Sequence, residues 1–211
     1  MIRWLSLGLS SQTRVCALAM ALGIFAAPGL SAQVCRGGTD VSPGWIAVGY
    51  GRASGNASVI GADFARRLSQ SFSVFGVGDL TAYPAPGPRR SRLGIGGAFT
   101  MIRSNAVDVC LTAAIERERI TNLTVLRVPV GVALAWSTTF ASGRARFGLH
   151  AEPSLVYTHK SIATYTHTSG PLSGRIGMVI GFRRLIGGLE FVNAFDNDAK
   201  WNARVRLGVT V

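Results

Sequence analysis

The C-terminal stretch of the chain, Lys200 to Val211 (KWNARVRLGVTV), alternates strictly between two kinds of residue. The apolar positions share one parity and are Trp201, Ala203, Val205, Leu207, Val209 and Val211. The other parity holds Asn202, Arg204, Arg206, Gly208 and Thr210. Successive side chains of a β-strand point to opposite faces, so a period of two is typical of a strand. The stretch therefore predicts a final strand with one apolar face and one face that carries arginine beside glycine.

Segments with the same alternation recur from Trp45 onwards, and turn-forming residues separate them. We predict ten strands, near residues 45–52, 58–68, 72–83, 92–102, 107–118, 126–136, 146–157, 175–183, 188–195 and 200–211. The facing of the third segment is ambiguous, because Val74 and Phe75 are adjacent and both apolar. Eight strands is the alternative count, because Pro129 and Pro153 fall inside two segments and each removes a backbone donor. A bulge shared by the two prolines would confine that disruption.

The connections between these segments alternate in length. The short ones are SQS, SNA, ASG and RLIG, whereas PAPGPRRS, RITN, the stretch 159–173 and DNDA are mostly longer. Outer-membrane barrels have short periplasmic turns and longer external loops, and an even number of strands leaves both ends in the periplasm. The chain therefore predicts an all-β fold, a closed antiparallel up-and-down barrel. The repeated YTHKS and YTHTS in the longest connection indicate a hairpin that extends above the membrane.

Three features place the apolar face of this barrel outside, toward lipid. The apolar face is bulky, whereas the polar face is made of small residues and scattered charges, which suits a narrow lumen. Aromatic residues gather near strand ends, as in an interfacial girdle: Tyr50, Trp136, Tyr157, Phe195 and Trp201. About ten residues per strand suffice to cross a bilayer at a tilt. The alternative is a soluble secreted barrel with an apolar interior.

Residues 1–32 have the pattern of a secretory signal peptide. Arg3 and Arg14 precede the apolar run Val15 to Leu30, and small residues at 31 and 32 offer a cleavage site. Residues 33–44 form a short polar segment, which we interpret as a periplasmic lead-in. The barrel then occupies residues 45–211, in a chain that is 48% hydrophobic and only 15% charged.

The polar faces of the predicted strands carry most of the charge. The chain has 22 Lys and Arg residues, of which only Lys160 and Lys200 are lysine, and its formal net charge is +12. The residues expected in the lumen are Asp63, Arg67, Arg92, Asp108, Glu116, Arg127, Arg146, His150, Glu152, Arg175, Arg183, Glu190, Arg204 and Arg206. Unpaired charges in a dry interior are strongly unfavourable, so we expect an arginine–carboxylate network that fills the lumen. The alternative is a small anion-preferring pore.

Two cysteines remain once the predicted leader is removed. Cys110 faces inward near the periplasmic end of its strand, and Cys35 lies in the lead-in. We predict that the lead-in tucks under the barrel mouth and that the two cysteines form a disulfide, as an oxidising compartment permits. The three histidines have no cysteine or carboxylate spacing that fits a metal site, so neither a metal nor another cofactor is expected.

Two patterns raise the question of catalysis. One face of the seventh strand carries the residue types of a hydrolytic triad at a spacing of two: His150, Glu152 and Ser154. Such residues are separated by about 7 Å per step along a strand, too far for direct proton relay. The His-x-Ser sequences at 159–161 and 167–169 are similar to a pair in outer-membrane lipid A deacylases, but they lie in or beside a loop. We predict no enzyme, with a lipid-modifying enzyme as the alternative.

With its leader, alternating strands, turn asymmetry and C-terminal strand, the chain resembles the small outer-membrane barrel proteins of the OmpA, OmpX and opacity-protein type, over about Trp45 to Val211. The resemblance implies residence in a bacterial outer membrane, with membrane lipid and the barrel insertion machinery as partners. We expect a structural role or the binding of a surface ligand through the outer loops. Nucleic acid is not expected as a partner, because no basic run is interleaved with aromatic residues.

Overall fold

The computed structural model describes Cys35 and residues 44–104, 107–121, 123–140, 145–162, 165–195 and 201–211. The predicted signal peptide, most of the lead-in and the DNDA connection lie outside these residues, as do the side chains of Phe195 and Trp201. In the described part, no helix has the length and apolar character that a membrane-spanning helix requires.

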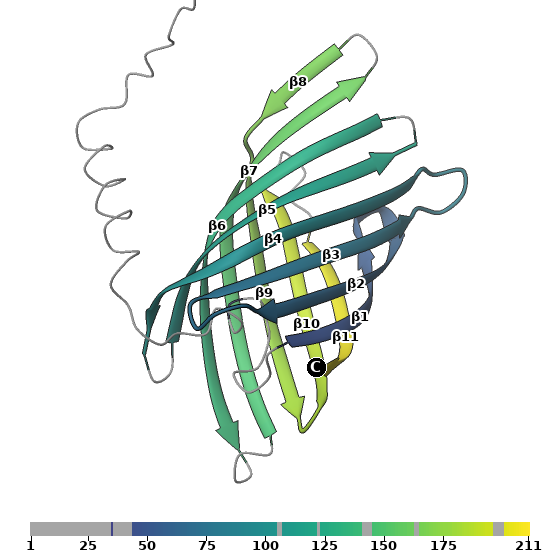
Figure 1. The fold of residues 1–211 in the computed structure, drawn as a ribbon. Coiled ribbons are helices and arrows are strands. Elements are labelled where there is room, and N and C mark those ends of the chain that lie inside the picture. Colours follow the sequence, from purple (N-terminus) through teal and green to yellow (C-terminus); the bar gives the residue numbers. More distant parts are fainter. Residues whose placement is uncertain are drawn as a thin grey trace, which may run out of the picture.

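In the continuous described ranges the fold consists of eleven strands and the short 3-10 turn η2 (Ser54–Asn56) (Figure 1). The strands are β1 (Gly44–Ala53), β2 (Ala57–Arg67), β3 (Phe72–Ala82), β4 (Arg89–Arg103), β5 (Val107–Ile120), β6 (Leu123–Phe140), β7 (Ala145–Ile162), β8 (Tyr165–Ser169), β9 (Leu172–Phe182), β10 (Leu185–Phe195) and β11 (Trp201–Thr210).

Ten of these strands close into an antiparallel up-and-down barrel, which confirms the predicted fold class. Neighbours in sequence pair with one another, except that β7 pairs with β9, and β11 returns to pair with β1. The Val211 amide donates to the Gly44 carbonyl at 2.9 Å, so the first and last described strands start and finish at the same end. We call this the closed end, and the opposite one the loop end.

The eleventh strand belongs to a hairpin rather than to the barrel wall. β6 and β7 are each 18 residues long, and β8 folds back on the far part of β7 with Thr158 opposite Ser169 and Ile162 opposite Tyr165. Figure 1 shows β8 and the end of β7 projecting beyond the other strands at the loop end. The predicted hairpin within 159–173 is therefore present.

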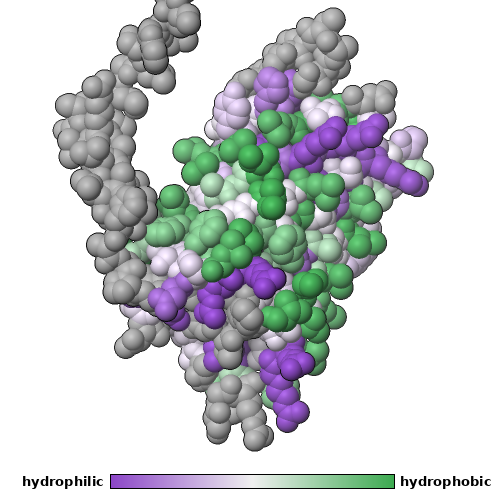
Figure 2. Space-filling view, in the orientation of Figure 1, coloured by the Kyte–Doolittle hydropathy of each residue, from purple (hydrophilic) through white to green (hydrophobic). Residues whose placement is uncertain are grey.

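Apolar side chains cover the outside of the barrel, and polar ones lie inside. On β11, the side chains of Val205 and Leu207 are 55% and 66% exposed. The alternate residues Arg204 and Arg206 are only 8% and 6% exposed. Figure 2 shows hydrophobic residues over the middle of the visible face. Hydrophilic residues lie at the upper right, near the loop ends of β4 and β5, and in the lower part of the view. Tyr50, Trp136 and Tyr157 are exposed on this outer surface. The inverted alternative, with an apolar interior, is wrong.

The pairing of β6 with β7 has no bulge at the two prolines. Pro129 lies opposite Val156 and Pro153 opposite Gly174, and the register of β6 and β7 is the same before and after the prolines. Each proline leaves a short gap in hydrogen bonding without displacing its strand, because a missing donor costs one or two bonds but demands no extra residue. The pairing of β4 with β5 has a register shift between Thr100 and Ile102, away from the prolines. The predicted count of ten barrel strands is confirmed.

The ambiguous third segment is resolved in favour of Phe75. Phe75 points inward and is 4% exposed, whereas its neighbour Val74 shares the outer face with Gly76 and Gly78. The ring of Phe75 belongs to the buried apolar cluster inside the barrel. The same parity sends Asp79 into the lumen.

Candidate functional site

Arg204 on β11 lies at the centre of the lumen and reaches across to β2 and β3. Its Nη1 donates to Asp79 Oδ1 at 2.8 Å, and its Nη2 donates to Asp63 Oδ2 at 2.6 Å. Glycines on the intervening strands make room for the guanidinium. A Cβ at Gly49 would lie 2.3 Å from Arg204 Nε, and one at Gly61 would lie 2.1 Å from Asp79 Oδ1. The small residues of the polar face are therefore the space that the ion pairs occupy.

Arg92 on β4 extends this network around the barrel. Its Nε donates to Asp79 Oδ2 at 2.9 Å, a second donor of the same guanidinium contacts the same oxygen, and Nη1 lies 3.4 Å from Glu116 Oε2. Asp79 thus accepts from two arginines that come from opposite directions. Charge-assisted bonds of this kind are stronger than neutral ones and fix the geometry of both partners.

A second group of charges lies on the opposite wall, on β7, β9 and β10. Arg175 bridges two carboxylates, with Nη1 3.7 Å from Glu152 Oε2 and Nε 3.4 Å from Glu190 Oε1. The Thr112 hydroxyl donates to Glu152 Oε1 at 2.6 Å. His150 Nε2 lies 3.8 Å from Glu190 Oε1. Arg206 on β11 also forms an ion pair with Asp63 of the first group, with its Nη1 3.7 Å from Asp63 Oδ2.

Between this network and the loop end lies a cavity of about 220 Å³, which we call the vestibule. Glu118 lies on its wall and has an arginine on each side, Arg90 and Arg127, each 3.6 Å away. The Arg90 guanidinium also lies over the ring of Tyr83, 5.3 Å from its centroid. These pairs are longer and more exposed than those of Arg204, so the vestibule is a charged pocket whose ion pairs are partly open to solvent.

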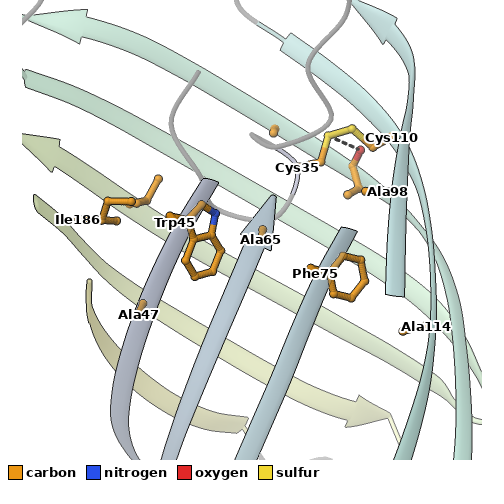
Figure 3. Packing of buried hydrophobic residues seen from close by; sticks show 12 residues of the cluster. Cys35, Trp45, Ala47, Ala65, Phe75, Ala98, Cys110, Ala114 and Ile186 are labelled. Atoms are coloured by element: carbon orange, nitrogen blue, oxygen red, sulfur yellow. Dashed lines mark hydrogen bonds between the residues drawn. A yellow bond between two sulfur atoms is a disulfide. The ribbon is translucent and has the colours of Figure 1, made fainter. Parts of the chain in front are cut away.

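The closed end is filled by apolar side chains, which we call the lumen seal. Figure 3 shows Trp45, Phe75, Ala65, Ala114 and Ile186 around this space, with the disulfide between Cys35 and Cys110 beside Ala98. The Cα atoms of the two cysteines are 6.2 Å apart, and both residues are fully buried. A small cavity of about 20 Å³ lies between the seal and the Arg204 network, and Trp45, Phe75 and Arg204 are among its lining residues.

The other residues predicted for the lumen have varied positions. Asp108 is buried and lies 3.6 Å from Arg103. Arg67 and Arg146 are half-buried on inward positions, and no ion pair joins either of them to a described carboxylate. The prediction for Arg183 is wrong: the chain reverses at Arg183–Arg184, so Arg183 is exposed in the turn, with φ of 53° and its guanidinium over the ring of Phe182.

Sequence reasoning missed four members of the network: Asp79, Arg90, Arg103 and Glu118. Glu118 has the parity of Glu116, and Arg90 has that of Arg92, so the alternation already contained the signal for both. Asp79 was hidden by the ambiguous facing of its strand.

The triplet His150, Glu152 and Ser154 lies on the inner face of β7, where His150 and Glu152 are buried within the charge network. No group of three or more His, Cys, Asp or Glu residues in the described ranges is placed to hold a metal ion.

Charge is segregated between the two faces of the barrel. The acidic residues of the described part are Asp63, Asp79, Asp108, Glu116, Glu118, Glu152 and Glu190, and all of them lie on the lumen side. Arginines occur on both faces. The outer surface of the described barrel therefore carries positive charge alone.

These features define a closed ten-stranded barrel with an apolar exterior and a charged, largely filled interior. No protein-family model and no curated protein matches the sequence. Among solved structures, a bacterial polysaccharide outer membrane secretin is similar with a TM-score of 0.47 and 10% identity, over 82% of this chain and 67% of that chain. A KdgM porin is similar with a TM-score of 0.40 and 7% identity, over 79% of this chain and 99% of that one. These likenesses concern the barrel alone. The assignment to the OmpA, OmpX and opacity type stays a prediction.

Proposed function

We propose that this protein is an integral barrel of a bacterial outer membrane, with its loop end toward the outside. The apolar outer face supports this proposal, because a barrel is stable in lipid only when outward residues are apolar and every strand edge is paired. Leu93, Ile95 and Leu207 are each more than 60% exposed, which would be unfavourable in water. Fractionation of cells and heat-dependent gel mobility test this residence, and a protein recovered in the soluble periplasm would contradict it.

We further propose that the barrel does not conduct ions. The observation that carries this is the position of Arg204, whose guanidinium is held by two carboxylates across the lumen at 2.6 and 2.8 Å. The lumen seal lies directly beneath it. Removing Arg204 would leave Asp79 with Arg92 alone and Asp63 with Arg206 alone, so that buried negative charge would be only partly compensated. The network therefore resists opening. In planar bilayers we expect no long-lived open steps from the purified protein, whereas an open porin in the same bilayer serves as the positive control.

The second candidate function is a small anion-preferring pore, which the vestibule and the arginines on its wall favour. Bilayer recordings separate the two candidates. Reproducible open steps of the wild-type protein, with anion preference in a salt gradient, would contradict the closed barrel and support the pore.

The role of such a barrel is then structural, or is the binding of a surface ligand at the loop end. The hairpin of β7 and β8 supports ligand binding, because it projects beyond the barrel wall and continues the strand β7, whose Ser154 and Val156 line the vestibule. Projecting loops on a rigid scaffold are a frequent place for binding. The proposal includes no catalytic role and no cofactor.

The binding role is tested with whole cells that display the protein. We would replace residues 160–168 by a two-residue turn and measure adhesion of the cells to an array of glycans and host-matrix glycoproteins. The matched control shortens the β3–β4 connection at residues 84–87 instead. Loss of adhesion with the first variant alone supports the hairpin as the binding element. If neither variant changes adhesion, the structural role is favoured.

A further inference from the structure

The outer face of the barrel has a groove of about 580 Å³ that crosses β2, β3, β4 and β5. Its floor is formed by Gly76 and Gly78 on β3. Phe64 stands on one side, and Leu93 and Ile95 stand on the other. Ligand pockets of proteins typically measure about 300–1,000 Å³, so the groove has room for a substantial apolar group.

The groove arises because two successive outward positions of β3 are glycines, Gly76 and Gly78. β3 presents Val74, Gly76, Gly78 and Leu80 to the outside, and the glycines lie between the larger side chains of β2 and β4. A Cβ at Gly76 would lie 2.1 Å from a ring carbon of Phe64, so the ring leans over the glycine. The groove is lined by aliphatic and aromatic carbon, which suits a hydrocarbon chain.

A cluster of arginines lies at the end of the groove nearest the loops, and we call it the arginine cluster. Arg117 on β5 lines the groove and is the register partner of Leu93. Arg119 lies two residues further along the same face, and Arg89 lies on the outer face of the neighbouring strand β4. All three are exposed. Residues two apart on a strand are separated by about 7 Å and strands by about 5 Å, so one head group can contact all three.

Among the residues that the structure describes, no carboxylate shares the outer surface with the arginine cluster. Every acidic residue of the described part lies on the lumen side, where arginines of the network bind it. A phosphate from outside the chain can therefore approach these exposed guanidinium groups without competition from a carboxylate of the described part. Arginine binds phosphate through paired hydrogen bonds, and basic residues beside a membrane attract anionic head groups.

We propose that the groove and the arginine cluster form one binding site for a phosphorylated, multiply acylated glycolipid of the lipid A kind. One acyl chain lies over Gly76 and Gly78, and the phosphates lie on Arg89, Arg117 and Arg119. Three cations match a head group with more than one phosphate better than they match a singly charged phosphodiester. The inference rests on the proposed residence in the outer membrane with the loop end outward.

The first test neutralises the arginine cluster. Wild-type protein and the variant Arg89→Gln/Arg117→Gln/Arg119→Gln are purified in detergent, and binding of bisphosphorylated lipid A is titrated by native mass spectrometry. The control, Arg66→Gln/Arg183→Gln/Arg184→Gln, removes the same charge at the closed end, where three other exposed arginines lie. We expect the first variant to bind at least about tenfold more weakly and the control to change by less than about twofold. Equal losses in the two variants would overturn the site.

The second test fills the groove without changing charge. In Gly78→Leu the new side chain enters the groove, because the nearest atom to a Cβ there is Leu93 Cδ2 at 3.2 Å. The control is Gly187→Leu, an outward glycine of β10 whose nearest neighbour would be Leu207 Cδ2 at 3.9 Å. Heat-dependent gel mobility verifies that both variants fold. We expect about fivefold weaker binding for Gly78→Leu alone, and unchanged binding would overturn the acyl-chain position.

The choice of lipid separates the remaining outcomes. Removing the phosphates from lipid A is expected to weaken its binding to the wild-type protein at least as much as neutralising the arginine cluster does. Equal binding with and without phosphate would overturn the role of the arginines. Phosphatidylglycerol bound as tightly as lipid A would overturn the choice of glycolipid. Failure of the proposed function shows itself separately, in fractionation, conductance and adhesion.

Discussion

The two halves of the lumen are built from the same alternation of residues, yet they are filled in different ways. Toward the loops, Glu118 lies 3.6 Å from each of two arginines, and a cavity of about 220 Å³ remains open. Toward the closed end, Arg204 is only 8% exposed, and its guanidinium donates to Asp63 at 2.6 Å and to Asp79 at 2.8 Å. Between Arg204 and the closed end, Trp45, Phe75 and the disulfide fill the lumen.

This difference shows that closure depends on which side chains share a level of the barrel. Where glycine lies beside arginine, the guanidinium crosses the lumen and is largely buried. Where arginine lies beside glutamate at the strand ends, both stay partly hydrated. Ion pairs contribute little when exposed, and their loss is costly when buried. The halves should therefore respond very differently to matched substitutions.

The largest effect is expected from Arg204→Leu. The substitution leaves Asp63 and Asp79 buried without their shared cation, which costs about 3–5 kcal/mol. The free energy of unfolding is measured by urea titration of tryptophan fluorescence in lipid vesicles. Arg66→Leu, on the outer face of β2, is the control and should change it by less than about 0.5 kcal/mol. Similar values for the two would show that the lumen at Arg204 is hydrated.

Removal of the disulfide should have the next largest effect. In Cys35→Ser/Cys110→Ser the loop of 75 residues between the cysteines is no longer closed in the unfolded chain. We expect the free energy of unfolding to fall by about 2–4 kcal/mol. Reduced wild-type protein should behave as the double variant does. If neither treatment changes the free energy of unfolding, side-chain packing alone stabilises the lumen seal.

A smaller loss is expected from a methyl group added inside the lumen. Gly61→Ala would bring a Cβ to 2.1 Å from Asp79 Oδ1 and 2.8 Å from the Gly78 carbonyl oxygen, so the ion pair must move. Overpacking of this kind costs about 1–3 kcal/mol. The same change at Gly187, on the outer face, should cost less than about 0.5 kcal/mol in the same titration. Equal costs would mean that the lumen yields as readily as the surface.

The smallest effect is expected in the vestibule. Glu118→Gln weakens two partly exposed pairs at 3.6 Å and should lower the free energy of unfolding by less than about 1 kcal/mol. A loss above about 2 kcal/mol would indicate that the vestibule is as dry as the level of Arg204, and would remove the contrast between the two halves.

Much of this arrangement was predictable from residue order. Parity alone placed Arg204, Arg206, Glu116 and Glu190 inside, because a strand has no freedom to choose which alternate residues share a face. The same rule misplaced Arg183, since alternation holds only until the chain turns and a turn position is set by local backbone geometry. The inward positions of Phe75 and Asp79 could not be predicted from the sequence, because the adjacent apolar residues Val74 and Phe75 leave the facing of the strand undetermined.

The sequence by itself determined that this chain forms strands, which face of each is apolar, and that a barrel with arginine inside follows. The tertiary structure decided which charges meet. Arg204 and Asp79 are 125 residues apart, and their contact depends on the register across β11, β1, β2 and β3 and on the glycines that let the guanidinium pass. Register is fixed by the closure of all ten strands together, which no local pattern specifies.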